Sequence, residues 1–258
     1  MSSLSSMSFS ESPLSTAEVE ASERLYGDLA QDIRDIRDFA IRTQVDADRV
    51  AAARALLQQA TQILAEDAPP EPAGIHYNSD GRSWNWGNAV VGVRNAIAPP
   101  VVLSWSDDDV VSSEVELGVA YEGPPGCVHG GVSSLLLDHL MGETASNRHT
   151  QLIVTGTLNL RYVLPLPLGR VRMQGRIEGM SGRKVTVKAH SGPADSDVPA
   201  VEATGLFIIP RWAQDVSDAA GVGSLDWRAS FRRPRWFTPA RGRASPSSSC
   251  PSCRLHPR

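Results

Sequence analysis

The amino-acid sequence predicts an α+β fold in which an antiparallel sheet wraps around one long helix. Stretches with the alternating polar and apolar pattern of strands occupy most of the chain from about residue 84 to residue 212. One strongly helical stretch, residues 132–148, interrupts them after a glycine pair. Strand and helix do not alternate repeatedly, so a parallel sheet is not expected.

The composition is that of a globular chain. Of 258 residues, 41% are hydrophobic and 21% are charged, with 21 Gly, 18 Pro and 3 Cys, which excludes collagen-like, fully disordered and disulfide-scaffold proteins. The formal net charge is -4, but residues 227–258 carry eight Arg and no acidic residue. The rest of the chain is therefore acidic, which argues against a nucleic-acid surface on the main domain.

The sequence also bears on location. No basic residue precedes an apolar run at the N-terminus, and no stretch of 18 apolar residues occurs, so neither a signal peptide nor a membrane span is expected. Cys127, Cys250 and Cys253 do not form an even set in a short secreted chain. We therefore expect a reducing, cytoplasmic location.

Two amphipathic helices are predicted between residues 15 and 67. Ser15 and Glu18 form a capping-box pattern for the first, and Asp46 or Asp48 can cap the second. Apolar residues then recur at helical spacing, and we expect these faces to pack on the main domain or on a partner subunit. The apolar positions are Leu25, Leu29, Ile33, Ile36 and Ala40 in the first helix and Val50, Ala53, Leu57, Ala60 and Leu64 in the second.

These patterns divide the chain into four segments. Residues 1–14 are expected to be disordered, residues 15–72 form the helical extension and a proline-rich linker, and residues 73–212 form the main domain. Residues 213–258 are expected to be a disordered basic tail, because their Arg, Ser and Pro content cannot bury enough apolar surface to become ordered. A basic segment that binds anionic lipid or nucleic acid is the alternative.

Alternating residues predict the strands of the main domain. In the stretch that follows the helix, strict alternation places Thr155 and Asn159 on one face, opposite Leu158 and Leu160. The expected strands, in chain order, are Val101–Leu103, Ser113–Ala120, Gln151–Tyr162, a hairpin from Val171 to Ala189 with its turn at Gly179–Gly182, and Val201–Ile209.

Several motifs, taken in order, resemble those of the PaaI-type hotdog-fold acyl-CoA thioesterases. The resemblance covers roughly residues 84–212. It implies a hotdog fold, a homodimer or dimer of dimers in which the sheets of two subunits pair, and hydrolysis of an acyl-CoA substrate. The motifs are His129-Gly130-Gly131, Asp138 eight residues after Gly130, Asn159-Leu160-Arg161-Tyr162 before Pro165-Leu166-Pro167-Leu168-Gly169, and Gly182-Arg183-Lys184.

The chemistry of thioester hydrolysis fits two of these positions. Gly130 and Gly131 open the helix, where backbone N–H groups lack partners and no Cβ blocks the approach of a carbonyl, so Gly130 is the candidate oxyanion donor and Gly131 a candidate substrate contact. Asp138 is the candidate general base or nucleophile. Eight helical residues rise about 12 Å, so Gly130 and Asp138 of one chain cannot act on the same carbonyl. We therefore expect a site shared by two subunits.

The helix residues also have structural interpretations. Asp138 could face solvent or bond a neighbouring strand, although an unpaired buried carboxylate would be costly. His129 could orient the loop or hold substrate, or simply bond the backbone. A metal site made of His129, Asp138 and His139 lacks a recognised ligand spacing, and neither a metal nor a cofactor is expected.

The strand and turn residues have two interpretations as well. By resemblance, Thr155 places a hydroxyl beside the carboxylate to orient the attacking water, or it only fills a strand. Asn159 is a candidate substrate-binding residue or satisfies buried backbone groups. Arg183 and Lys184 are candidate ligands of the CoA phosphates, with exposed hairpin charge as the alternative. Several relatives have Asn or Gln where this chain has Gly123, and one acyl-CoA thioesterase branch shares the Glu-Gly-Pro-Pro-Gly form of this chain, so the resemblance leaves a second carbonyl contact open.

Two other functions are compatible with these patterns. A non-catalytic acyl-CoA-binding or scaffold protein of the hotdog type would bind ligand without turnover. A hotdog hydratase or dehydratase would need a histidine placed as base with an acidic partner. The spacing between the glycine pair and Asp138 counts against the hydratase.

Overall fold

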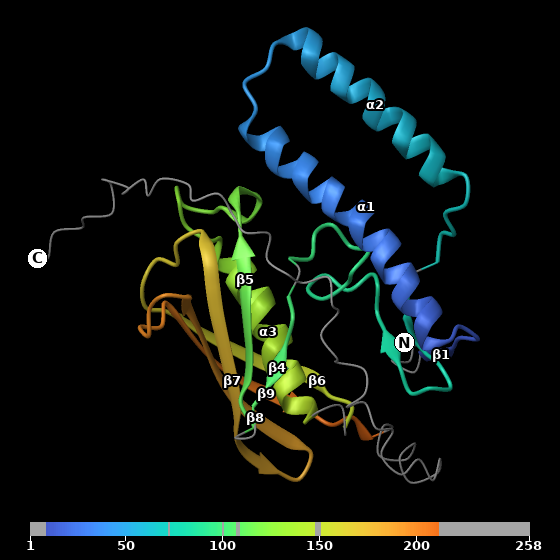
Figure 1. Ribbon diagram of the computed structural model, residues 1–258. Helices are drawn as coiled ribbons and strands as arrows, with labels where there is room; N and C mark the ends of the chain where they lie inside the picture. The colour runs from blue at the N-terminus through green and yellow to red at the C-terminus, as the bar shows by residue number, and fades with distance from the viewer. Residues whose placement is uncertain (1–8, 72, 100, 107–108, 148–150, 212–258) are drawn as a thin grey trace, which may run out of the picture.

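The main domain is a six-stranded antiparallel sheet curled around one helix (Figure 1). The computed structural model describes residues 9–71, 73–99, 101–106, 109–147 and 151–211, and in this part of the chain the strand order is β4-β5-β7-β8-β9-β6. The predicted α+β architecture is confirmed. The elements are β4 (Ser104–Trp105), β5 (Val111–Leu117), helix α3 (Gly130–Ser146), β6 (Val154–Tyr162), β7 (Gly169–Ser181), β8 (Lys184–Pro193) and β9 (Val201–Ile208).

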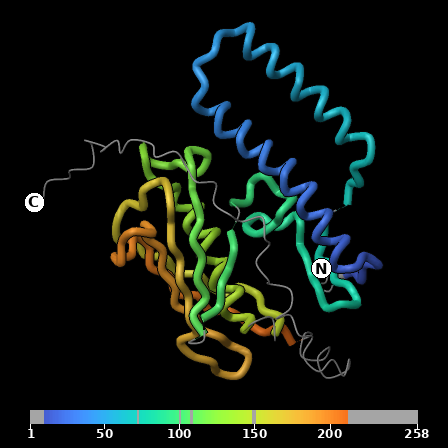
Figure 2. The backbone as a smooth tube through the Cα atoms, viewed as in Figure 1, coloured from blue at the N-terminus to red at the C-terminus, as the bar shows by residue number. Residues whose placement is uncertain are grey.

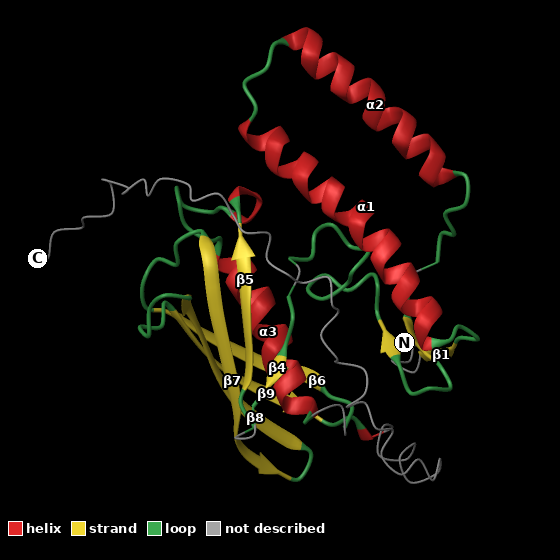
Figure 3. Ribbon diagram, viewed as in Figure 1, coloured by secondary structure: helices red, strands yellow, loops and turns green. Residues whose placement is uncertain are grey.

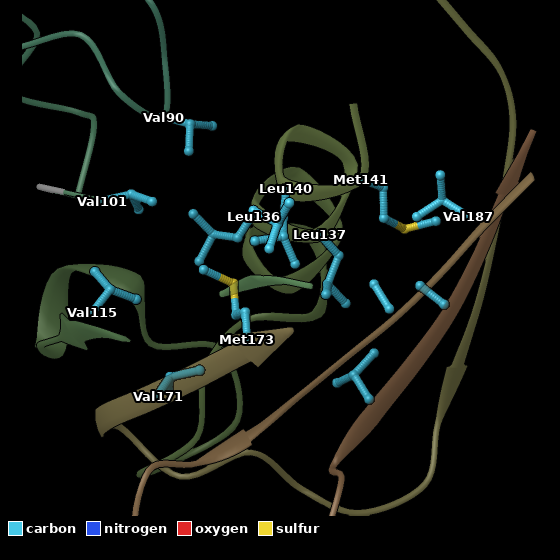
Figure 4. Packing of buried hydrophobic residues seen from close by; sticks show 14 of the residues in the cluster. Val90, Val101, Val115, Leu136, Leu137, Leu140, Met141, Val171, Met173 and Val187 are labelled. Carbon is cyan, nitrogen blue, oxygen red and sulfur yellow. The ribbon is translucent and has the colours of Figure 1, made fainter. Parts of the chain in front are cut away.

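The core lies between α3 and the concave face of the sheet. Alternate residues of β5 and β9 point inward. Four side chains on two consecutive turns of α3 are almost fully buried between the helix and the sheet (Figure 4). Burial of each such side chain stabilises the fold by about 1.5–3 kcal/mol. This packing fixes α3 against the sheet, and with it the first turn of the helix. The four side chains are Leu136, Leu137, Leu140 and Met141.

A β-bulge interrupts the strict alternation predicted for β6. Thr155 pairs with Phe207, but Thr157 pairs with the next residue of β9, Leu206, so Gly156 is the extra residue. Thr155 therefore lies on the same face as the buried Phe207, towards α3. The prediction that Thr155 shares a face with Asn159 is wrong, because one inserted residue reverses which side of the sheet the earlier positions face.

The hairpin and the first two strands also differ from the prediction. β7 runs to Ser181 through a bulge between Ile177 and Gly179, so the turn consists of Gly182 and Arg183, with Gly182 at φ 56°. The chain between Val101 and Leu103 is not a strand, and residues Val119–Tyr121 form a 3-10 helix, η2, instead of continuing β5. The last strand is confirmed, one residue shorter at its end.

A second, small sheet lies outside the main domain. Strand β1 (Phe9–Glu11) pairs in parallel with β2 (Ile75–Tyr77), and β2 pairs antiparallel with β3 (Ser83–Trp84). The expectation that residues 1–14 are disordered is therefore wrong for residues 9–14, while residues 1–8 lie outside the described residues. Residues near 75–84, expected in the main domain, belong with the N-terminal segment because they pair with β1.

The two predicted helices of the extension are confirmed as α1 (Thr16–Arg42) and α2 (Ala47–Ala65) (Figure 3). Ser15 and Glu18 form the complete capping box, and Asp46, not Asp48, caps α2. α1 packs against the segment that follows β3 and buries Val19 and Ala30. These caps and contacts fix where each helix begins and how α1 is oriented.

α2 stands away from the sheet and runs back beside α1 (Figure 2). It contains no buried residue, so the expectation that it packs on the main domain is wrong within one chain. Its packing on a partner subunit stays a prediction. Of the helices in the described ranges, none is long and apolar enough to cross a membrane. The basic tail predicted at residues 213–258 lies outside the described residues.

Candidate active site

The first turn of α3 presents one free backbone donor. His129 is the N-cap residue, and its Nδ1 accepts a 3.0 Å hydrogen bond from Gly131 N–H. The next two N–H groups, of Val132 and Ser133, both donate to His129 O. Within the described part of the chain, Gly130 N–H has no hydrogen-bond partner. Of the two glycines, it is therefore Gly130 whose donor is available to a ligand.

The loop before α3 holds His129 in place through its own backbone. His129 N–H donates to Tyr121 O at 2.9 Å, and Gly123 N–H donates to Cys127 O at 2.9 Å. A Cβ atom on Gly123 would lie 2.7 Å from His129 Cα, closer than real Cβ contacts allow. Gly123 is thus required for the close approach of the loop to His129, and no side chain from this position can contact a substrate carbonyl.

Two hydroxyl groups that the sequence interpretation missed surround the Gly130 carbonyl. Ser134 Oγ and Tyr162 Oη donate to Gly130 O at 3.0 and 2.9 Å, and the two hydroxyl oxygens lie 2.9 Å apart. A Cβ on Gly130 would lie 3.2 Å from the Tyr162 ring and its hydroxyl. Helical spacing could have indicated Ser134, which lies four residues after Gly130, whereas no local signal indicates Tyr162. Gly130, His129, Ser134 and Tyr162 are hereafter the donor half.

A carboxylate and a hydroxyl meet further along the same helix. Thr155 Oγ1 donates a 3.0 Å hydrogen bond to Oδ1 of Asp138. Asp138 is half-buried and Thr155 is exposed, so the carboxylate remains open to solvent on one side. Asp138 and Thr155 are hereafter the carboxylate half. Because α3 is continuous, the two halves of one chain lie about 12 Å apart along the helix.

The predicted phosphate contacts lie at the same end of the sheet as the carboxylate half. Lys184 pairs with Ile208, which pairs with Val154, so the turn is two strands, about 10 Å, from the start of β6. Lys184 is exposed, whereas Arg183 Nη1 donates to Ile209 O at 2.8 Å. Lys184 is therefore the freer of the two cations.

Asn159 is not brought to either half. It pairs with Thr204, which lies on the outward face of β9, and it is exposed on the face of the sheet away from α3. The expectation that it satisfies buried backbone groups is wrong within one chain, and its substrate-binding role stays a prediction. Within the described ranges, no three His, Cys, Asp or Glu side chains are arranged to hold a metal ion.

Comparison with known proteins identifies the family of the chain. Residues 125–190 match the thioesterase superfamily. A crystal structure of a thioesterase superfamily protein is 33% identical, covers 71% of this chain and 90% of its own, and superimposes with a TM-score of 0.61. The sheet wrapped around α3 defines a hotdog fold, as predicted. The chain belongs to the thioesterase superfamily. This confirms the prediction that it is a member of a family of thioester hydrolases, while its assignment to the PaaI type stays a prediction.

Curated relatives are similar over a shorter stretch. Acyl-coenzyme A thioesterase THEM4 of Xenopus laevis is 35% identical over 92 residues, which are 35% of this chain and 41% of that protein. The same enzyme of Rattus norvegicus is 32% identical over 92 residues, 35% of this chain and 39% of that protein. The matched region is thus about two fifths of the length of these relatives.

Proposed function

We propose that this protein hydrolyses an acyl-CoA thioester to the free acid and CoA, at a site that two copies of the chain build together. The observation that carries the proposal is the free Gly130 N–H at the start of the helix that also bears the Thr155-bonded Asp138. The names of the THEM4 relatives support an acyl-CoA substrate.

In this mechanism the donor half of one copy binds the thioester carbonyl. Gly130 N–H and the positive end of the α3 dipole stabilise the negative charge that develops on the carbonyl oxygen. Asp138 of the second copy takes a proton from water while the water oxygen bonds to the carbonyl carbon, or it attacks that carbon directly. In either route the carbon–sulfur bond then breaks, and the thiolate leaves and takes a proton to give CoA. After attack by water the product acid is already formed, whereas after direct attack a water molecule hydrolyses the acyl–Asp138 anhydride, which releases the acid and restores the carboxylate.

The shared site requires a particular dimer. β6 is the last strand in the sheet, and its outer edge has no strand partner in the described part of the chain. Antiparallel pairing of two β6 edges would bring Thr155 of one copy towards Tyr162 of the other, and so one carboxylate half towards one donor half. Exposed Val163 and Leu164, which directly follow this strand, support its burial in a homodimer or dimer of dimers.

The nucleotide part of the substrate would extend from the carboxylate half towards the β7–β8 turn. Lys184 is exposed there, and Arg183 retains donors beyond the one bonded to Ile209 O. Cations of this kind suit the phosphates of CoA. The turn would therefore contribute to KM more than to kcat.

A thiol-release assay with acyl-CoAs of different chain length and an aromatic acyl-CoA tests the proposal. Asp138→Asn removes the charge with little change of shape, so we expect kcat to fall by about a hundredfold or more with KM little changed. Asp48→Asn, at an exposed position of α2, is the matched control and should keep wild-type turnover. Binding of acyl-CoA by the wild-type chain without any release of thiol would favour the non-catalytic alternative.

A further inference from the structure

The long helix of the N-terminal extension reaches the segment that leads into α3. Arg37, a half-buried residue of α1, donates from Nη1 to Ala96 O at 2.9 Å. Its guanidinium also lies over the Tyr121 ring, 4.9 Å from the centroid, with Nη2 3.5 Å from the Tyr121 hydroxyl. Tyr121 Oη in turn donates to Ile97 O at 2.9 Å. Arg37 and the 96–97 backbone thus hold the Tyr121 side chain from two sides.

Tyr121 connects directly to the donor half. Its backbone carbonyl accepts the 2.9 Å hydrogen bond from His129 N–H, and His129 caps α3 by accepting from Gly131 N–H. The position of His129 therefore sets the direction of the peptide that carries the free Gly130 N–H. Three consecutive contacts join Arg37 to this donor, namely Arg37 to Tyr121, Tyr121 to His129, and His129 to the first turn of α3.

We propose that α1 is a positioning element of the active site and that Arg37 is its positioning residue. The proposal rests on the proposed thioesterase function and assigns a role to the N-terminal extension, which lies outside residues 125–190 that match the superfamily. Catalysis by oriented donors is sensitive to displacements of a fraction of an ångström to 1 Å. A helix that fixes Tyr121 therefore affects the rate of the chemical step without touching the substrate.

The chain offers a matched control for simple stabilisation by α1. Arg34, one turn earlier on the same helix and also half-buried, donates from Nε to Ala98 O at 3.0 Å and from Nη2 to Asn95 O at 3.1 Å. It anchors α1 to the same 95–98 segment as Arg37 does. In the described structure it makes no hydrogen bond to Tyr121 and does not lie over its ring, and its interaction with Tyr121 is only a longer-range electrostatic one. Loss of either arginine weakens the docking of α1, and only loss of Arg37 releases Tyr121.

The experiment compares Arg37→Met, Arg34→Met and Tyr121→Phe in the full chain. For Arg37→Met we expect kcat to fall by about tenfold or more with KM within about twofold of wild type. Tyr121→Phe, which keeps the ring but loses the hydroxyl, should show a smaller fall in kcat. Arg34→Met should lower the Tm by a similar amount to Arg37→Met and leave kcat unchanged. Equal kcat values for the two arginine variants would overturn the proposal.

A second measurement does not depend on turnover. Amide hydrogen exchange of residues 129–133 should be faster in Arg37→Met than in wild type and unchanged in Arg34→Met. Equal exchange in both variants overturns the positioning role even if the substrate assignment is wrong. Conversely, a wild-type protein that hydrolyses no acyl-CoA but shows the selective exchange effect contradicts the proposed function and leaves the connection between α1 and α3 standing.

Discussion

The Thr155 hydroxyl donates to Asp138 Oδ1 at 3.0 Å across the gap between β6 and α3. This contact exists because the extra residue Gly156 turns Thr155 inward, to the same face as Phe207. The bond occupies one carboxylate oxygen and orients the group, so the other oxygen remains available to a water molecule or a carbonyl carbon. A β-bulge thus converts an edge strand into part of a candidate active site.

Replacing Thr155 tests this contact. Thr155→Val keeps the branched shape and removes the donor, and hydrogen bonds to charged groups are worth about 1.5–3 kcal/mol, so we expect kcat to fall about tenfold or more. Thr155→Ser keeps the hydroxyl and should keep most of the activity. Steady-state kinetics of the two variants measure the difference. Equal rates for Val and Ser would mean that the residue only fills the strand.

A double-mutant cycle tests the two hydroxyls of the donor half. Tyr162→Phe and Ser134→Ala each remove one donor to Gly130 O, and each should cost about 1 kcal/mol or less, because the other hydroxyl remains. The free-energy loss of the double variant should clearly exceed the sum of the two single losses. It is measured both from the free energy of unfolding and from kcat/KM. Additive losses would show that the two groups do not hold the same carbonyl.

The docking of α1 on residues 75–84 should weaken at acidic pH, because it depends on the ionised carboxylate of Asp80. Its carboxylate accepts hydrogen bonds from Thr16 Oγ1 at 2.8 Å and Thr16 N–H at 3.1 Å, and these bonds lower the pKa of Asp80 below its ordinary value of 3.8. A carboxyl group whose pKa is lower in the folded state than in the unfolded chain stabilises the fold at pH values above its unfolded pKa. This stabilisation is lost as the pH falls through the pKa of the folded state.

The Tm difference between wild type and Asp80→Asn should accordingly be larger at pH 7 than at pH 3. Thermal unfolding at both values measures it, with Glu20→Gln, at an exposed position of α1, as a control for general charge effects. A difference that stays constant between the two pH values would contradict the assigned role of the Asp80 carboxylate.

The sequence predicts features that depend on local chemistry. The capping box at Ser15 and Glu18, the helix opened by Gly130 and the strand that ends before Pro210 all follow from residues close together in the chain. The candidate pair Gly130 and Asp138 was also recognisable, because spacing along a helix converts directly into distance.

Features that depend on distant partners were not predictable in the same way. The bulge at Gly156 is set by its pairing with β9, since a glycine in an alternating stretch is equally compatible with a regular strand. Tyr162 reaches Gly130 across 32 positions of sequence, and Arg37 reaches Tyr121 across 84. β1 is only three residues long, and without its partner β2 nothing marks it as a strand.

The last prediction concerns the assembly of the site. If the donor half of one copy works with the carboxylate half of another, Asp138→Asn and Gly130→Val should each be inactive alone. Valine at position 130 would press its Cβ against the Tyr162 ring and block the approach of a carbonyl. A mixed dimer of the two variants then contains one site with both defects and one site with neither.

Mixing the two inactive variants should therefore restore activity. Random reassociation makes half of the dimers mixed, each with one intact site of two, so we expect about a quarter of the wild-type specific activity. Light scattering checks the oligomeric state, and differently tagged chains verify that subunits have exchanged. Circular dichroism checks that Gly130→Val is folded. Full activity in a verified monomer, or no recovery after verified exchange of folded subunits, would contradict the shared site, because a site shared by two chains is rebuilt when the two different defects lie on different chains.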